Sequence, residues 1–270
     1  WTGVDCNIEK SKEILMSALH NDASTTVGRY GNRTYNYFSS QYNTYSGGYV
    51  PRGQYIGDME FQRCRPTEYT YAVFDNVNDS RMWKTFKTVY GICNNVATPD
   101  YVKAENAPTF GDQGVLFLLN KKDDTRFRKD EFGRAAIKHT FVNPETGKWV
   151  PNVAPVYAEG QYVMNTYGTS AANRSNMFCG INKTADGSRT GEKGDAHRDV
   201  TMARVGETYL VKAECQVRNG DDAGALATIN LLRKRAEWKA GEDREYYVDG
   251  TYSKTSLTKT GDSADETTAS

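Results

Sequence analysis

The chain has 270 residues and carries 34 basic and 34 acidic side chains, so its formal net charge is zero. Nucleic-acid-binding surfaces normally show an excess of Lys and Arg, and this balance argues against one. The longest apolar run, residues 115–119, is far shorter than the roughly 18 residues that mark a transmembrane helix.

Residues 1–57 predict short elements embedded in loops. The apolar side chains between residues 8 and 19 indicate the end of a helix followed by a short buried strand. Residues 23–57 then contain no Asp or Glu, and tyrosines alternate with glycines and small polar residues, as in a loop-rich surface with local strands. This tyrosine-rich segment holds Tyr30, Tyr35, Tyr37, Tyr42, Tyr45, Tyr49 and Tyr55.

The middle of the chain predicts strands separated by loops. Strands are expected at residues 69–74, 115–119 and 135–142, where aromatic and aliphatic residues cluster. One short amphipathic helix is expected at residues 81–92, because its apolar side chains recur at helical spacing. Residues 173–195 are rich in Gly, Asn and Ser, a composition typical of a loop.

Residues 200–238 predict two antiparallel helices with a short connection. Apolar side chains recur at helical spacing in both halves of this stretch. Between them, Asn219 and Gly220 supply a helix stop, since glycine tolerates the left-handed conformation that ends helices. Asp221 or Asp222 is expected to cap the second helix. The connection is short, so the two helices are expected to be neighbours in a hairpin.

The hairpin sequence carries a family pattern. It contains Arg204-x-x-Glu207-x-Tyr209-Leu210-x-x-Ala213-Glu214, then Gly220-Asp221, then Ala225-Leu226-x-x-Ile229-Asn230-x-x-Arg233-x-Arg235-Ala236. This pattern resembles the signature hairpin of the SusD/RagB family, the surface nutrient-binding lipoproteins of Bacteroidetes. Residues 11–15 look like the family's mid-chain strand, and residues 78–86 resemble its "nDpR…tf" stretch. The spacing in the first helix is also that of a tetratricopeptide repeat (TPR).

The resemblance implies a function without catalysis. Family members capture a glycan or another nutrient oligomer, in some cases a peptide, at the cell surface for polysaccharide utilization. They pass it to a SusC-like TonB-dependent transporter in the outer membrane. Membrane contact would come from a lipid anchor outside this segment. Because the chain begins at Trp1 and matches neither end of a family member, we expect a middle portion of a longer protein.

These elements predict a fold class and three regions. We expect a mainly α fold with irregular and short β segments, in which a TPR-like (SusD-like) helical hairpin joins a large loop-rich region. Residues 1–198 are the loop-rich region and the candidate ligand-binding part, and residues 199–240 are the hairpin. Residues 241–270 are a polar linker or insertion, and all three regions belong to one SusD-like domain.

Residue types that build catalytic centres show no catalytic spacing, so no enzyme, metal or cofactor is expected. His20, His139 and His197 are not in a metal-ligand pattern, and the five cysteines form no C-x-x-C pair. Glu207 and Glu214 lie seven residues apart on the first predicted helix, which fits either an acid–base pair or structural ion pairs. Structural ion pairs are favoured, because Glu/Arg pairs are ordinary helical features. The basic partners expected in such a ladder are Arg204, Arg233 and Arg235.

The tyrosine-rich segment is the candidate binding site. Sugars stack apolar CH faces on aromatic rings and hydrogen-bond through their hydroxyls, so binding needs aromatic and polar side chains together. The expected ligand-binding residues are Tyr37, Tyr42, Asn43, Tyr45, Tyr49 and Tyr55, and their rings should be partly exposed. Core packing is the alternative for these tyrosines. The alternative functions are a TPR-like protein-interaction scaffold and, least favoured, a glycoside hydrolase.

Overall fold

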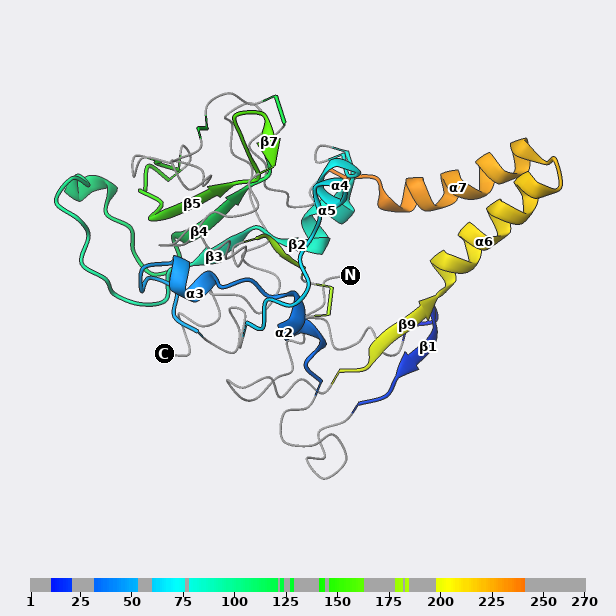
Figure 1. Ribbon diagram of the computed structural model, residues 1–270, viewed down its shortest axis with the longest axis horizontal. Helices are drawn as coiled ribbons and strands as arrows, with labels where there is room; N and C mark the ends of the chain where they lie inside the picture. The colour runs from blue at the N-terminus through cyan, green and yellow to red at the C-terminus, as the bar shows by residue number, and fades with distance from the viewer. Residues whose placement is uncertain are drawn as a thin grey trace.

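The computed structural model has two visible parts, a main body and an arm that projects from it (Figure 1). The arm consists of strands β1 (Ile14–Ala18) and β9 (Val200–Arg204) and helices α6 (Val205–Arg218) and α7 (Asp222–Ala236). The structure describes residues 11–20, 32–52, 60–75, 78–120, 122–123, 127–128, 141–143, 146–162, 178–181, 183–184 and 198–240.

The main body combines short helices with short strands. Its helices are α2 (Thr34–Phe38), α3 (Tyr42–Tyr45), α4 (Glu68–Ala72), α5 (Ser80–Thr85) and the 3₁₀ turn η2 (Ala104–Asn106). Its strands are β2 (Phe86–Lys87), β3 (Val89–Gly91), β4 (Gln113–Leu118), β5 (Asn152–Pro155), β6 (Tyr157–Ala158), β7 (Gln161–Tyr162) and β8 (Gly180–Ile181).

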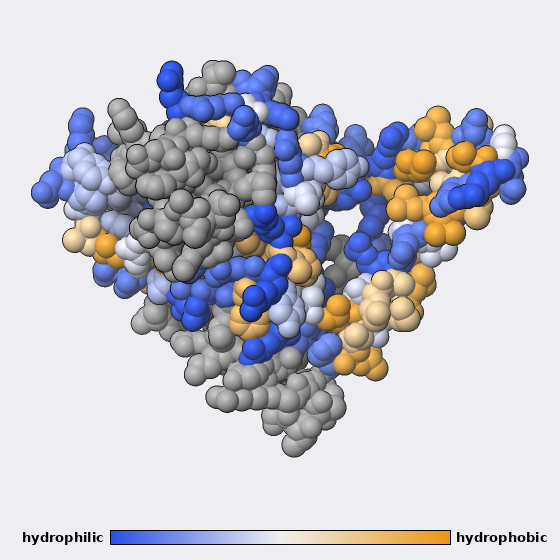
Figure 2. All heavy atoms as spheres, in the orientation of Figure 1, coloured by the Kyte–Doolittle hydropathy of each residue, from blue (hydrophilic) through white to orange (hydrophobic). Residues whose placement is uncertain are grey.

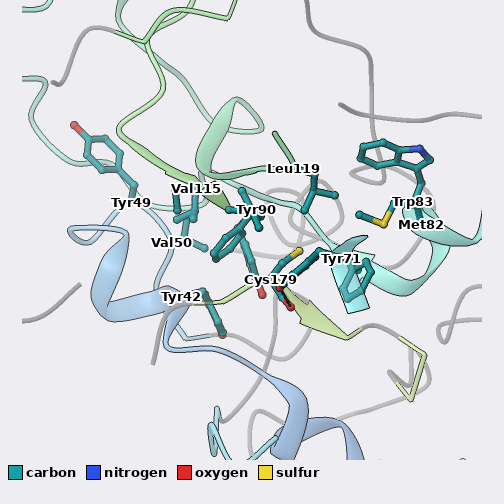
Figure 3. Packing of buried hydrophobic residues seen from close by; sticks show 14 of the residues in the cluster. Tyr42, Tyr49, Val50, Tyr71, Met82, Trp83, Tyr90, Val115, Leu119 and Cys179 are labelled. Carbon is teal, nitrogen blue, oxygen red and sulfur yellow. Dashed lines mark hydrogen bonds between the residues drawn. The ribbon is translucent and has the colours of Figure 1, made fainter. Parts of the chain in front are cut away.

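A three-stranded sheet of order β3-β4-β5 organises the core. Strand β4 pairs antiparallel with β3 and parallel with β5, and all six of its residues are buried. Its side chains alternate between two apolar clusters, as the pleat of a strand requires. Val115 and Phe117 join the larger cluster, which includes Tyr42 and Tyr90 (Figure 3). Leu116 joins the smaller one. Burial on both faces explains why this strand is a continuous apolar run.

The prediction of a mainly α fold is wrong. Helix makes up 31% and strand 22% of the described residues, so the chain mixes both types. Residues predicted as a strand at 69–74 instead form most of helix α4, because the Thr67 hydroxyl caps it by accepting a hydrogen bond from the Thr70 amide at 3.3 Å. The helix predicted at 81–92 ends at Thr85, since the following residues pair in β2 and β3 with distant strands.

The helical hairpin forms as its sequence predicts. Helix α6 ends at Arg218, and Gly220 adopts a positive φ of 78° in the connection. Asp221 caps α7, because its carboxylate accepts a hydrogen bond from the Gly224 amide at 2.9 Å. The same carboxylate accepts a bond from the Gln216 side chain on α6 at 3.1 Å, so one residue joins the two helices.

We expect the substitution Asp221→Ala to lower the free energy of unfolding of the hairpin by about 1 kcal/mol, since it removes this cap. Hydrogen exchange of the α7 amides measures the effect locally. Asp222→Ala is the matched control, because Asp222 is the first residue of α7 and Asp221 makes the capping bond. Equal protection losses in the two variants would contradict the capping role.

Large apolar side chains are exposed along the arm (Figure 2). The hairpin interface buries only small side chains, those of Ala213, Ala225 and Thr228. Leu210 on α6 and Leu226 on α7 are exposed. The short strand expected near the start of the chain forms as β1. It was expected to be buried, but Leu15 and Met16 on it are exposed.

Candidate functional site

The structure buries two of the tyrosines predicted to bind ligand. Tyr42 is 0% exposed and stacks on Tyr90 with ring centroids 4.6 Å apart and an interplanar angle of 7°. Tyr49 is 6% exposed and meets Trp149 edge-on at 6.1 Å. Both rings belong to the main apolar cluster, in which Tyr42 lies next to Tyr90 (Figure 3), so the expectation that they are exposed platforms is wrong. A ring packed on protein has no free face for a sugar.

The other predicted site residues are dispersed. Tyr37 on α2 is 44% exposed and lies 5.7 Å from the ring of Phe61. Asn43 on α3 is half-buried, and its side-chain oxygen accepts no hydrogen bond from the described residues. The side chain of Tyr45 and the whole of Tyr55 lie outside the described part of the chain. Among the predicted tyrosines whose side chains the structure describes, only Tyr37 is exposed.

A pocket of about 390 Å³ lies instead between α4, α5 and the ends of β4 and β5. Its lining includes Glu68, Tyr71, Phe74, Asn120, Lys122 and Tyr157. The apolar wall belongs to the main core: Tyr71 and Phe74 both pack on Phe86, with centroid distances of 5.1 and 5.9 Å. Figure 3 shows Tyr71 and two further lining residues, Met82 and Leu119, on one side of this core.

Polar groups gather at one side of the pocket. The Lys122 ammonium donates to the Glu68 carboxylate at 3.0 Å, and both side chains are exposed. This hydrogen bond raises the pKa of Lys122. Burial, and then the negative charge of Glu68, raise the pKa of the Tyr157 phenol, so that hydroxyl stays protonated near neutral pH. The pocket therefore combines a carboxylate, an ammonium and a phenol with an aromatic wall.

Asn120 has a positioning role. Its side-chain amide donates to the Tyr157 carbonyl at 2.8 Å and accepts from the Tyr157 amide at 2.9 Å. These paired bonds fix the start of β6 against the end of β4, and so hold Tyr157 at the pocket.

The described residues that line the pocket include few of the groups that catalytic centres use. Glu68 is the one carboxylate among the described residues lining it, and glycoside hydrolysis normally uses two. Within the described ranges, no group of three or more His, Cys, Asp or Glu residues could hold a metal ion. No helix in the described part of the chain is long and apolar enough to span a membrane.

The expected ion-pair ladder within the hairpin is not formed. Glu214 pairs with Arg218 on its own helix at 2.5 Å. Arg235 pairs with Glu13, just before β1, instead of with a glutamate of the hairpin. Both pairs lie on the arm and serve its local structure, apart from the pocket.

Sequence reasoning missed the pocket because its residues carry no motif. Glu68 and Lys122 are 54 positions apart, and only the fold joins them. Phe74 lies in a segment predicted as a strand, which would place alternate side chains on opposite faces and give no pocket wall.

Comparison with known proteins identifies the family. The family model of the SusD family matches residues 12–267, nearly the whole chain. Comparisons with curated proteins and with solved structures each returned no match. The match includes the arm, whose hairpin carries the family pattern, and the main body with its pocket. The chain belongs to the SusD family.

Proposed function

We propose that the chain is part of a non-catalytic cell-surface receptor that captures a glycan or another nutrient oligomer. It delivers the ligand to a SusC-like TonB-dependent transporter, and a lipid anchor outside this segment holds it at the outer membrane. Family membership supports this general role. The observation that carries it for this chain is the pocket, where an aromatic wall adjoins exposed polar groups.

Binding in this proposal uses stacking and hydrogen bonds, and no covalent bond is made or broken. The half-buried ring of Phe74 offers a face for the apolar side of a sugar ring. Glu68 accepts and Lys122 donates hydrogen bonds to sugar hydroxyls at the pocket mouth. Among the tyrosines first considered, Tyr37 stays a proposed accessory contact because its ring is exposed. Tyr45, Tyr55 and Asn43 stay predictions.

We expect Phe74→Ala to weaken glycan binding about tenfold, since one lost stacking platform costs on the order of 1–2 kcal/mol. Calorimetric titration of the full-length protein with a panel of oligosaccharides and peptides measures the effect. Tyr69→Ala is the matched control: Tyr69 lies on α4 close to Phe74 but is 75% exposed and does not line the pocket. Equal affinities of the Phe74 variant and the parent would overturn the pocket assignment.

A protein-interaction scaffold is the second candidate, and the exposed apolar side chains of α6 and α7 favour it. The same titrations separate the two functions. A parent protein that binds none of the offered ligands, yet co-purifies with the transporter, would favour the scaffold. Turnover of a polysaccharide, abolished by one Asp or Glu substitution, would instead identify a hydrolase.

A further inference from the structure

A long loop, residues 92–112, connects two strands that a tight turn could join. Strands β3 and β4 are consecutive antiparallel neighbours, and two residues are enough to link such a pair. The loop has 21 residues, and its one regular element is the turn η2. Figure 1 shows it, in teal, projecting from the side of the main body that faces away from the arm. Ordered loops longer than about 12–15 residues are uncommon and usually functional, so its length indicates a role beyond connection.

Hydrogen bonds fix the middle of this loop to the main body. The Trp149 amide donates to the Asn106 carbonyl at 2.9 Å, and the Asn106 side-chain amide donates to the Gly147 carbonyl at 2.6 Å. The Lys148 ammonium donates to the Ala107 carbonyl at 3.0 Å. The loop is therefore held against the turn that precedes β5.

One tyrosine of the loop faces solvent. The Val102 amide donates to the Pro99 carbonyl at 2.9 Å, so Asp100 and Tyr101 are the central residues of a β-turn. Val102 packs against the larger core cluster, whereas Tyr101 is 58% exposed. The Tyr101 ring meets Trp149 nearly edge-on, with centroids 6.0 Å apart and an interplanar angle of 84°. The turn therefore presents a ring that a buried tryptophan supports and that is still open to solvent.

A series of aromatic rings connects Tyr101 to the core. Trp149, which contacts Tyr101, is buried and also meets the ring of Tyr49. Figure 3 shows Tyr49 at the margin of the core, with its hydroxyl directed away from Tyr90. That hydroxyl donates to the Ala97 carbonyl of the loop at 3.4 Å. Because the supporting rings are already packed, a ligand that stacks on Tyr101 has little ordering cost to overcome.

Polar side chains flank the exposed ring along the chain. Asp100 and Lys103 are exposed, and Lys103 forms an ion pair with Glu105 at 3.8 Å. An exposed aromatic ring beside hydrogen-bond donors and acceptors suits a sugar, which offers both an apolar face and hydroxyl groups. A protein partner normally covers a patch whose centre is poor in charged residues. We propose that Tyr101, supported by Trp149, is a second saccharide-stacking platform, separate from the pocket.

The platform and the pocket lie at opposite ends of the central sheet. Strands β4 and β5 run parallel; the loop and Trp149 precede them, whereas the pocket residues Asn120 and Tyr157 follow them. The six residues of β4 span about 20 Å at about 3.3 Å per residue. A polysaccharide that reaches both sites would bind more tightly than a short oligosaccharide, because its second contact is intramolecular. The saccharide class of the ligand rests on the proposed function, and the platform narrows it to polymers.

The test uses the full-length protein with xylan, galactomannan, mixed-linkage β-glucan and pectin. Hydroxyl-radical footprinting with mass spectrometry identifies the side chains that each polysaccharide protects. We expect protection of Tyr101 both in the parent and in Phe74→Ala, in which the pocket is altered. In calorimetric titrations with the protecting polysaccharide, Tyr101→Ala should bind about tenfold more weakly, since one stacking platform is lost. Tyr101→Phe keeps the ring and should bind nearly like the parent.

The outcomes separate the platform from the pocket. Tyr69→Ala is the matched control, because it removes another exposed tyrosine from outside the loop and should not change the affinity. Absence of protection at Tyr101 with all four polysaccharides, or equal affinities of Tyr101→Ala and the parent, would overturn the platform. If Phe74→Ala still weakened binding, the proposed function of the pocket would stand without it. Protection of Tyr101 with unchanged affinity in Phe74→Ala would support the platform and contradict the pocket. Lost co-purification of the transporter with Tyr101→Ala, at unchanged polysaccharide affinity, would assign the loop to a protein interface instead.

Discussion

Replacing Tyr90 with Ala is expected to lower the free energy of unfolding by about 3–5 kcal/mol, the range for removing a large buried aromatic side chain. Tyr90 is fully buried, stacks on Tyr42 and meets the edge of Phe117 at 6.3 Å. Its removal would leave a cavity between α3 and the central sheet, because both neighbouring rings are fixed by their own packing. Denaturant unfolding followed by circular dichroism gives the free energy.

The variant Tyr90→Phe keeps the ring and controls for the hydroxyl group. We expect it to retain most of the stability, since the stacked and edge contacts involve the ring alone. If Tyr90→Ala lowered the free energy of unfolding by less than about 1 kcal/mol, as is usual for a surface substitution, Tyr90 would not be an important part of the core packing. If Tyr90→Phe were as unstable as Tyr90→Ala, the hydroxyl and not the ring packing would be responsible.

Replacing Lys183 with Met is expected to raise the free energy of unfolding near pH 7 by about 3 kcal/mol. Lys183 has a pKa of about 8 in the folded protein, against 10.5 as its ordinary value. Below pH 8 both states carry the proton, so the folded state bears the full cost of the buried charge. Between pH 8 and 10.5 the unfolded state binds more protons, and parent stability should rise with pH.

A pH series of denaturant unfolding curves checks this expectation. The parent should gain stability from about pH 8 to pH 10.5, whereas Lys183→Met should lack that rise. Lys212→Met is the control, because Lys212 is an exposed lysine on α6. Equal pH dependence in the parent and Lys183→Met would show that the ammonium is well solvated.

Local sequence signals predicted the elements that depend on local contacts. The hairpin was predictable because its stop at Gly220 and its cap at Asp221 act within a few residues of each other. Strand β4 was predictable because burial on both faces requires an unbroken apolar run. Residues 86–91 were predicted as helix because their apolar spacing fits one, but long-range pairing with β8 and β4 makes them strands.

The candidate site was harder to predict because burial is a property of the whole fold. Composition located aromatic rings near Asn and Gly, and this mixture suits a binding loop and a packed core equally well. Tyr42 on α3 and Tyr49 after it are core residues because both pack into the cluster that contains Tyr90 and Trp149. The pocket needed Glu68, Phe74 and Lys122 to meet, and no spacing in the sequence links them. The family, in contrast, was visible in the hairpin pattern alone.

The pairing of β1 with β9 closes a very long loop. Ala18 lies opposite Val200, so the ends of the intervening 181 residues meet at the base of the arm. The entropic cost of closing a flexible loop grows only with the logarithm of its length, and doubling the length adds about 0.6 kcal/mol. The arm can therefore tolerate insertions and deletions in the enclosed region at little cost to its own closure. Related chains could change the ligand-binding region extensively while keeping the same strand pair and hairpin.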